Sequence, residues 1–414
     1  MQLSQRIRIF PTPEQEDVLW HLSERCRLAY NFALSERKTA WEKDSRSVGY
    51  MKQQNDLPML KQKYPEYGWV HSKVLQMTLR ILDADYKSFY ALRKKGDEEA
   101  QPPKYKGKNY FTTMVHNQSG FKVENNVVWL SQSYNKGITL NFAIPDKFKF
   151  KKVTQVTISQ DDRDEYYLSI VHEVPTKPYD SNDMYQAIDL GVSKTVTAVN
   201  MLGKFFEAKN PRPDKYWNPK ADAIQSKRDH CRKYSRGWNK YNLAMNVCTK
   251  KRSNQIKDYQ HKLSRKMVNN TRAKTIIIGD LNVKSMAQSP NTYARLNRST
   301  QNNGYLSQFA GFLTYKSELV GKKVIEISEY NTSKMCCSCG KIHDMALSKR
   351  RMRCDCGNDI DRDRNSAVNI MVRFLSQNAK WTGYQQFADN LRQTGLTIVS
   401  NSQEAMTSNH PQVV

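Results

Sequence analysis

The first part of the chain alternates hydrophobic and polar residues in a way that predicts one strand followed by helices. Alternation over residues 3–10 is typical of a strand, which Pro11-Thr12-Pro13 would end. Thr12 can cap a helix that has Pro13 at its first position, and helical spacing of apolar residues continues beyond it. A second amphipathic helix is expected over about 70–93.

From residue 102 the pattern changes to short apolar runs separated by turns, which is typical of a β-barrel or a β-sandwich. The strands are expected at residues 127–130, 137–142, 153–158 and 166–171. The strand at 3–10 has no partner near it in the sequence. We therefore expect it to join this later sheet, with the helical segment 12–101 inserted between them.

From about residue 184 the pattern predicts an α/β domain, because apolar strands alternate with helices. A buried strand ends at Asp189-Leu190-Gly191, and further strands are expected at 275–278 and 323–328. The helices are expected at 218–268, 303–320 and 364–375. The final residues, about 398–414, are rich in Asn, Ser and Gln and are expected to be disordered.

Two closely spaced cysteine pairs lie in the last quarter of the chain. Cys336 and Cys339 are separated by two residues, and Cys354 and Cys356 by one. Four thiolates at such gaps are typical of a closed, structural zinc site with no open position. Cys337 is an alternative to Cys336, but only Cys336 keeps the two-residue gap. The other cysteines are scattered, which argues against a disulfide framework and favours a reducing cytoplasm.

Carboxylates stand at the ends of two expected elements, on either side of the cysteine pairs. Asp189 follows a buried strand, and Gly191 lets the chain turn close to a metal or a phosphate. Asp363 opens the helix after the cysteines and can also cap it, with Asp361 as the alternative ligand. Nucleases of the RNase H-like (RuvC) type hold two divalent metals with carboxylates placed in this way.

The second acidic residue of such a site is missing from its usual position. A glutamate normally ends the strand that corresponds to 275–278, but here Gly279 follows that strand and cannot bind a metal. Either the site is inactive or another carboxylate has taken over. Glu329 ends the next expected strand, and neighbouring strands lie about 4.8 Å apart, a gap that a glutamate spans. Glu326 points to the other face, and Asp280 is shorter and out of phase, so we predict Glu329.

The charge of the chain points to a polyanionic partner. Lys and Arg number 66 against 40 Asp and Glu, a net charge of +26 over 414 residues. Nucleic acid is favoured over an anionic membrane surface as this partner. No apolar run approaches the roughly 20 residues that a membrane span needs. Residues 220–274 carry 16 Lys and Arg against 3 Asp. A solvated helix face usually mixes signs, so we interpret this segment as facing nucleic acid.

Smaller groups of side chains add candidates for nucleic-acid binding. Lys73, Gln76 and Arg80 form one polar stripe on the helix at 70–93, suited either to solvent or to base edges in a major groove. Trp238 and Tyr241 in the basic segment can stack on bases or pack the helix, and the sequence does not decide between these roles.

These motifs resemble those of the TnpB family, the transposon-encoded RNA-guided DNA nucleases related to type V CRISPR effectors. The resemblance covers most of the chain and is carried by residues 8–15, 26–31, 259–264, 280–284 and 331–334 together with the cysteine pairs. Gly279 departs from the family pattern. One branch of the family, and its Fanzor relatives, is similar in pairing that loss with a glutamate at the position of Glu329. Another branch lost its acids and became RNA-guided repressors, whereas Asp189 and Asp363 remain here.

The resemblance implies a multidomain α+β fold. A β-barrel wedge domain (1–11 and 102–182) would contain an inserted helical recognition domain (12–101). An RNase H-like (RuvC) α/β domain (183–332 and 359–376) would carry a zinc-ribbon insertion (333–358), and the tail 377–414 would be partly disordered. The implied cofactors are two Mg²⁺ ions, held by Asp189, Glu329 and Asp363, and one Zn²⁺ ion.

The function so implied is an RNA-guided, Mg²⁺-dependent endonuclease for double-stranded DNA, encoded by an insertion-sequence-type transposon. A guide RNA from the transposon end would select the target, and the protein would read a short target-adjacent motif. The alternative is a cleavage-deficient RNA-guided DNA-binding repressor. A direct DNA transposase is a third reading, against which the zinc ribbon and the split barrel argue. The expected location is the prokaryotic cytoplasm, in association with the nucleoid and not with a membrane.

Overall fold

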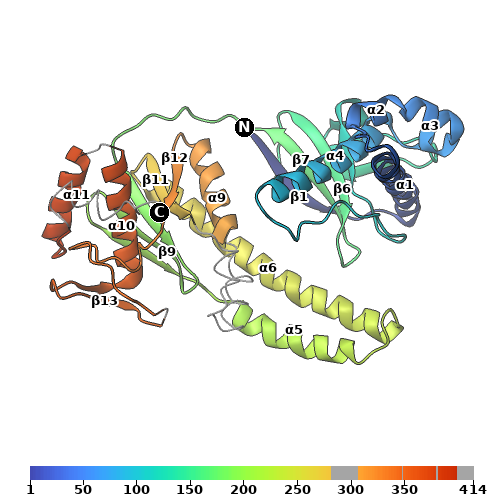
Figure 1. Cartoon of the computed structure of the whole chain (residues 1–414). Helices are drawn as coiled ribbons and strands as arrows, with labels where there is room; N and C mark the ends of the chain where they lie inside the picture. The colour runs from blue at the N-terminus through green and yellow to red at the C-terminus, as the bar shows by residue number, and fades with distance from the viewer. Residues whose placement is uncertain (281–305, 347, 379–380, 399–414) are drawn as a thin grey trace. The chain divides into compact units, whose positions relative to one another are not determined.

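The structure is a computed structural model that describes residues 1–280, 306–346, 348–378 and 381–398 (Figure 1). The chain divides into two compact units, Met1–Val174 and Pro175–Val414. Within the described residues no helix is both long and apolar enough to cross a membrane. The expected disorder of 398–414 falls outside the described residues from position 399 onward.

The first unit contains a four-stranded antiparallel sheet in the order β1-β7-β6-β2. Strand β1 (Gln2–Ile9) pairs with β7 (Tyr166–Glu173), which confirms that the first strand joins the later sheet. Strands β6 (Val153–Gln160) and β2 (Met114–Asn117) complete it. A separate three-stranded sheet is formed by β3 (Phe121–Glu124), β4 (Val127–Leu130) and β5 (Leu140–Ala143).

A β-barrel or a β-sandwich was predicted here, and within residues 1–174 the strands form two separate sheets and no closed barrel. The 3-10 turn η2 (Gln118–Gly120) lies between β2 and β3, and Gln118 has a left-handed φ of 47° there. The turn changes the direction of the chain. Strand β3 therefore leaves the edge of β6 and pairs with β4 instead.

The helices of the first unit share one hydrophobic core with its strands. Thr12 caps α1 (Pro13–Asp44) through a capping box with Gln15, as the Pro-Thr-Pro motif predicted. Fully buried leucines of α1 and of α4 (Ser72–Lys94) belong to the same apolar cluster as strand residues such as Ile158. The shorter helices α2 (Tyr50–Asn55), α3 (Leu57–Lys63) and η1 (Pro65–Trp69) connect them.

The second unit is built on a five-stranded sheet in the order β10-β9-β8-β11-β12. Strands β8 (Tyr185–Leu190), β11 (Thr275–Asp280) and β12 (Lys323–Ser328) are parallel neighbours. Strand β9 (Lys194–Asn200) runs antiparallel to β8, and β10 (Phe205–Lys209) runs antiparallel to β9. The carboxyl ends of the three parallel strands therefore meet at one edge, as the sequence predicted.

Helices cover both faces of this sheet. On one face α10 (Arg362–Gln377) and α11 (Trp381–Gln393) form an apolar cluster with Ala187 and Val199. On the other face α6 (Arg236–Asn270) and α9 (Leu306–Leu319) pack over Ile188 and Ile276. Helix α11 was not predicted. The tail 377–414, which was expected to be partly disordered, thus contains a packed helix.

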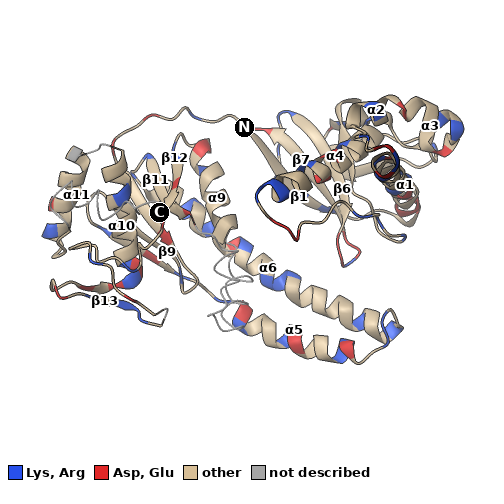
Figure 2. Cartoon of the chain, viewed as in Figure 1, with Lys and Arg blue, Asp and Glu red and all other residues tan. Residues whose placement is uncertain are grey.

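The segment 218–268 is helical as predicted, but it forms a hairpin of two helices, and the turn between them was not predicted (Figure 1). Helix α5 (Asp214–Asp229) ends at the cap residue His230, and α6 starts after Ser235, whose side chain accepts from the backbone N–H of Trp238. Tyr234 at the turn has a left-handed φ of 65°. Figure 2 shows Lys and Arg along α6 and at the turn between the helices.

Candidate metal centres

Asp189 lies near the carboxyl end of β8, the central strand of the sheet. Its Oδ1 accepts a hydrogen bond of 2.8 Å from the hydroxyl of Ser366 in α10. Burial raises the pKa of Asp189 well above its usual range, and the charges of Asp363 and Glu329 raise it further against the opposing effect of Ser366. Asp363 and Glu329, predicted from two other motifs, therefore lie near enough to Asp189 for their charges to act on it.

Asp361 and Asp363 have different roles at the start of α10. Asp361 is the cap, and its Oδ1 accepts from the backbone N–H groups of Asp363 and Arg364 at 3.0 and 3.2 Å. It also pairs with Lys194 at 3.0 Å. Burial alone would raise the pKa of Asp361, but the hydrogen bond from Lys194 and the helix amides lower it. The expectation that Asp363 caps the helix is therefore wrong.

Asp363 keeps its carboxylate available because Asp361 provides the cap. Burial and the charge of Asp361 raise the pKa of Asp363, and Lys194, at 4.0 Å, only partly offsets this. Of the two aspartates, Asp361 is thus already balanced by protein cations and amides, whereas Asp363 lacks a full counter-charge. This difference favours Asp363 over Asp361 as a metal ligand.

Glu329 occupies the space beside Gly279, directly after β12. Gly279 of β11 is paired in register with Ile327 of β12. A Cβ added at Gly279 would lie 2.5 Å from Oε2 and 3.0 Å from Cβ of Glu329. Burial raises the pKa of Glu329 to about 7, with a contribution from Asp280 and an opposing one from Arg373. The carboxylate predicted on the neighbouring strand therefore stands where a side chain at 279 would begin.

Arg373 of α10 fixes the backbone on both sides of Glu329. Its guanidinium donates to the carbonyl oxygens of Ser328 at 2.5 Å and Tyr330 at 2.8 Å. Sequence reasoning missed this residue, since an arginine within a helix carries no local signal of such a role. The two alternative acids are placed less favourably. Both Glu326 and Asp280 are exposed, and both line a shallow groove against α9.

The four predicted cysteines form one compact cluster. The Sγ atoms of Cys336, Cys339, Cys354 and Cys356 lie within 4.8 Å of one another. Cys337 points away into the apolar cluster under α10, where burial raises the pKa of its thiol to about 12. The cluster therefore uses Cys336, as its spacing predicted. Four thiols and no carboxylate are a donor set that fits a closed zinc site.

Two buried asparagines connect this cysteine cluster to α10. Asn365 accepts from the backbone N–H of Cys337 at 2.9 Å and donates to the carbonyl of Met335 at 2.7 Å. Asn369 donates to Met335 and to Thr332. The segment that enters the cysteine cluster is thus bonded to the helix that carries Asp363. The hairpin of β13 (Arg351–Arg353) and β14 (Asp359–Asp361) completes the connection.

The predicted polar stripe lies on the first unit. Lys73, Gln76 and Arg80 are on α4, where the first two are partly buried and Arg80 is exposed with its guanidinium 5.1 Å from the ring centre of Tyr50. They share one side of the helix, as the spacing predicted. Their role in binding nucleic acid stays a prediction.

Three family models match separate parts of the chain. One, described as a "Helix-turn-helix domain" of the OrfB/IS605 type, covers residues 1–46. In this structure those residues form β1 and the single long helix α1. A "Probable transposase" model of the same type covers 169–290, and a Cas12f1-like TNB domain covers 307–370, which include the cysteine cluster.

Relatives similar to this chain include one that matches nearly its whole length. A Streptomyces pristinaespiralis protein named "Putative RNA-guided DNA endonuclease" is 27% identical over 99% of this chain and 98% of its own. "TnpB-like protein L79" of Acanthamoeba polyphaga mimivirus is 32% identical over 44% of this chain, which spans about a third of that protein (32%). The chain belongs to the TnpB family.

Solved structures similar to this TnpB-family chain agree with its fold. A Cas12f1 chain from a complex with a single guide RNA and target DNA has a TM-score of 0.57 at 13% identity, over 87% of this chain and 83% of its own. The mini-RNA-guided endonuclease CRISPR-Cas_phi3 has a TM-score of 0.51 at 11% identity, over 90% and 92%. At these identities the likeness establishes the fold alone.

Proposed function

We propose that this chain is an RNA-guided, Mg²⁺-dependent endonuclease that cuts double-stranded DNA beside a short target-adjacent motif. The observation that carries the proposal is the position of Glu329, whose carboxylate fills the space next to Gly279 and interacts with Asp189. With Glu329, the proposed set of three acids would be complete in spite of the glycine. The names of the relatives, which include an RNA-guided DNA endonuclease, support the same activity.

The three carboxylates fit divalent metal ions because their negative charge lacks compensation. The pKa of each is raised, first by burial and then by neighbouring carboxylates. A cation among them would remove both the desolvation cost and the repulsion. Asp189, Glu329 and Asp363 would hold two Mg²⁺ ions, which activate the attacking water and stabilise the leaving oxygen of the phosphodiester.

Other side chains hold these acids in place. Ser366 donates to Asp189 and fixes its carboxylate, while Arg373 sets the backbone around Glu329. Lys194 neutralises Asp361, which leaves Asp363 as the open acid of α10. The four cysteines would bind one structural Zn²⁺ and thereby order the segment that Asn365 bonds to this helix.

The partners proposed are a guide RNA transcribed from the transposon end and the target DNA. The basic hairpin of α5 and α6 and the stripe of Lys73, Gln76 and Arg80 supply cationic and polar surfaces for them. We place the protein in the branch of the family with the relocated glutamate. The alternative, which the glycine at the usual position of the second acid suggests, is an RNA-guided binder that represses without cutting.

Cleavage by the protein purified with its co-expressed RNA tests the proposal. Double-stranded DNA with a guide match and a randomised flank is incubated with Mg²⁺ or with EDTA. Wild type and Glu326→Ala, which removes the exposed glutamate of the opposite face, should both cut with Mg²⁺. Glu329→Ala should not. Tight RNA-dependent binding by wild type without any cutting would instead establish the guided repressor.

A further inference from the structure

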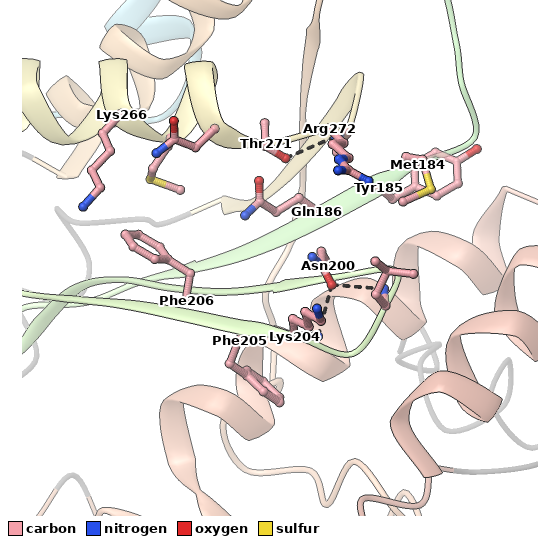
Figure 3. A pocket seen from close by; sticks show the side chains of 14 residues that line it. Met184, Tyr185, Gln186, Asn200, Lys204, Phe205, Phe206, Lys266, Thr271 and Arg272 are labelled. Carbon is pink, nitrogen blue, oxygen red and sulfur yellow. Dashed lines mark hydrogen bonds between the residues drawn. The ribbon is translucent and has the colours of Figure 1, made fainter. Parts of the chain in front are cut away.

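A cavity of about 380 Å³ lies beside the first residues of β8, at the opposite end of that strand from Asp189 (Figure 3). Its walls come from the last turn of α6, from residues 271–273 and from the turn between β9 and β10. The predicted nucleic-acid stripe of α4 does not contribute to it, and neither do the three acids. It is therefore separate from the metal centres.

Gln186 is an unexpected side chain at this position. Alternation along β8 places Gln186 on the same face as Ile188 and Leu190, and both of these are buried in the apolar cluster under α6 and α9. An apolar residue would suit that face best. Instead the Oε1 atom of Gln186 is buried and has no hydrogen-bond partner among the residues that the structure describes. A buried acceptor without a partner destabilises the fold unless something else donates to it.

The surroundings of Gln186 define which donor fits. In Figure 3 the side chains of Gln186, Phe206 and Lys266 extend from β8, β10 and α6 toward the same space. Arg272 lies beside it, and Lys204 lies at the β9–β10 turn. Among the described residues that line this cavity none is acidic. A ligand with a negative charge, a flat ring and an N–H or O–H donor matches these walls.

We propose that the cavity holds one nucleotide of the bound RNA. Its phosphate would lie against Lys266 and Arg272, its base against the ring of Phe206, and its base or its 2′-hydroxyl would donate to Oε1 of Gln186. The 2′-hydroxyl is a donor that DNA lacks, which favours RNA. This inference rests on the proposed RNA-guided function and adds a contact at the edge of the sheet away from the acids.

RNA binding by variants of the full chain tests this. Gln186→Leu removes the acceptor and restores the apolar pattern of β8, so the RNA-free protein should melt at a higher temperature. Its affinity for the RNA that co-purifies with wild type should nevertheless fall roughly ten-fold, the loss of one hydrogen bond at about 1.4 kcal/mol. Lys266→Gln should also weaken binding. Lys323→Gln, at an exposed lysine of β12 outside the cavity, serves as the charge-matched control.

Photocross-linking of 4-thiouridine-labelled RNA locates the contact. Wild type and Lys323→Gln should give a cross-linked peptide containing Phe206, and Gln186→Leu should lose it. Wild type that binds RNA and cuts DNA, with unchanged affinity in Gln186→Leu and Lys266→Gln and no cross-link here, would overturn the inference and leave water in the cavity. Wild type that neither binds RNA nor cuts would overturn the proposed function as well, so the two failures are distinguishable.

Discussion

Replacing Gly279 with alanine should disable cleavage although alanine has no charge and the backbone accepts it. Gly279 lies within β11 and does not have a left-handed φ, so its importance is the room that it leaves. The added Cβ would lie 2.5 Å from Oε2 of Glu329, whereas unbonded heavy atoms prefer about 3.5–4.0 Å. The glutamate must therefore move by roughly 1 Å, which can cost about 100-fold in rate.

The assay is single-turnover cleavage with saturating RNA and Mg²⁺, with binding of RNA and DNA measured in parallel. We expect Gly279→Ala to cut about 10- to 100-fold more slowly with both affinities unchanged. Gly311→Ala is the control, because an added Cβ at Gly311 of α9 meets nothing within 4 Å. It should cut at the wild-type rate.

A double substitution separates crowding from the loss of an acid. Glu329→Ala alone should abolish cutting, and Gly279→Glu combined with Glu329→Ala returns a carboxylate to the edge of the sheet from the neighbouring strand. We expect the double variant to recover part of the activity that Glu329→Ala loses. Full activity of both Gly279→Ala and Glu329→Ala would refute the assignment of Glu329 to the metal site.

Three further predictions concern stability and zinc binding. The pKa of Glu329, about 7, exceeds its ordinary value of 4.5, so its protonated form stabilises the metal-free fold below pH 4.5 and this contribution is lost as the pH rises through 7. Urea unfolding in EDTA should show that the free energy of unfolding falls by on the order of 3 kcal/mol between pH 4.5 and pH 8. The fall should be smaller in Glu329→Gln. Cys354→Ser should reduce bound zinc, measured by mass spectrometry, and should slow cleavage, because Asn365 bonds the zinc segment to α10. Tyr234→Gly should be more stable than Tyr234→Ala by roughly 1 kcal/mol in thermal unfolding, since the left-handed φ of 65° favours glycine; equal stabilities would contradict this.

The site could be predicted where two local patterns determine one position. Strand 323–328 was predicted at its observed bounds, and two-residue alternation with parallel pairing was enough to direct Glu329 toward Gly279. The cysteine spacing likewise selected Cys336 over Cys337. In each case the information lies within a few residues of the chain or in the order of adjacent strands.

The sequence did not reveal contacts that depend on distant segments. Asp361 and Asp363 both suit the start of a helix, and the ion pair with Lys194, from the hairpin on the far side of β8, distinguishes them. The break at the tip of the α5–α6 hairpin was also missed, because the polar pattern continues across it. Helix α11 was hidden by the Asn- and Gln-rich composition of the tail, although the buried side chains Tyr384, Phe387 and Leu391 have helical spacing.

Gly279 and Glu329 are best understood as one structural element on two strands. A carboxylate at either position can reach the same edge, because β11 and β12 are paired in parallel with Gly279 opposite Ile327. Both positions cannot carry full side chains, since a Cβ at 279 would collide with Glu329. Under the proposed function the glycine makes room for the glutamate, so its presence alone does not indicate a lost active site. A reading of either residue alone would reach the opposite conclusion about catalysis.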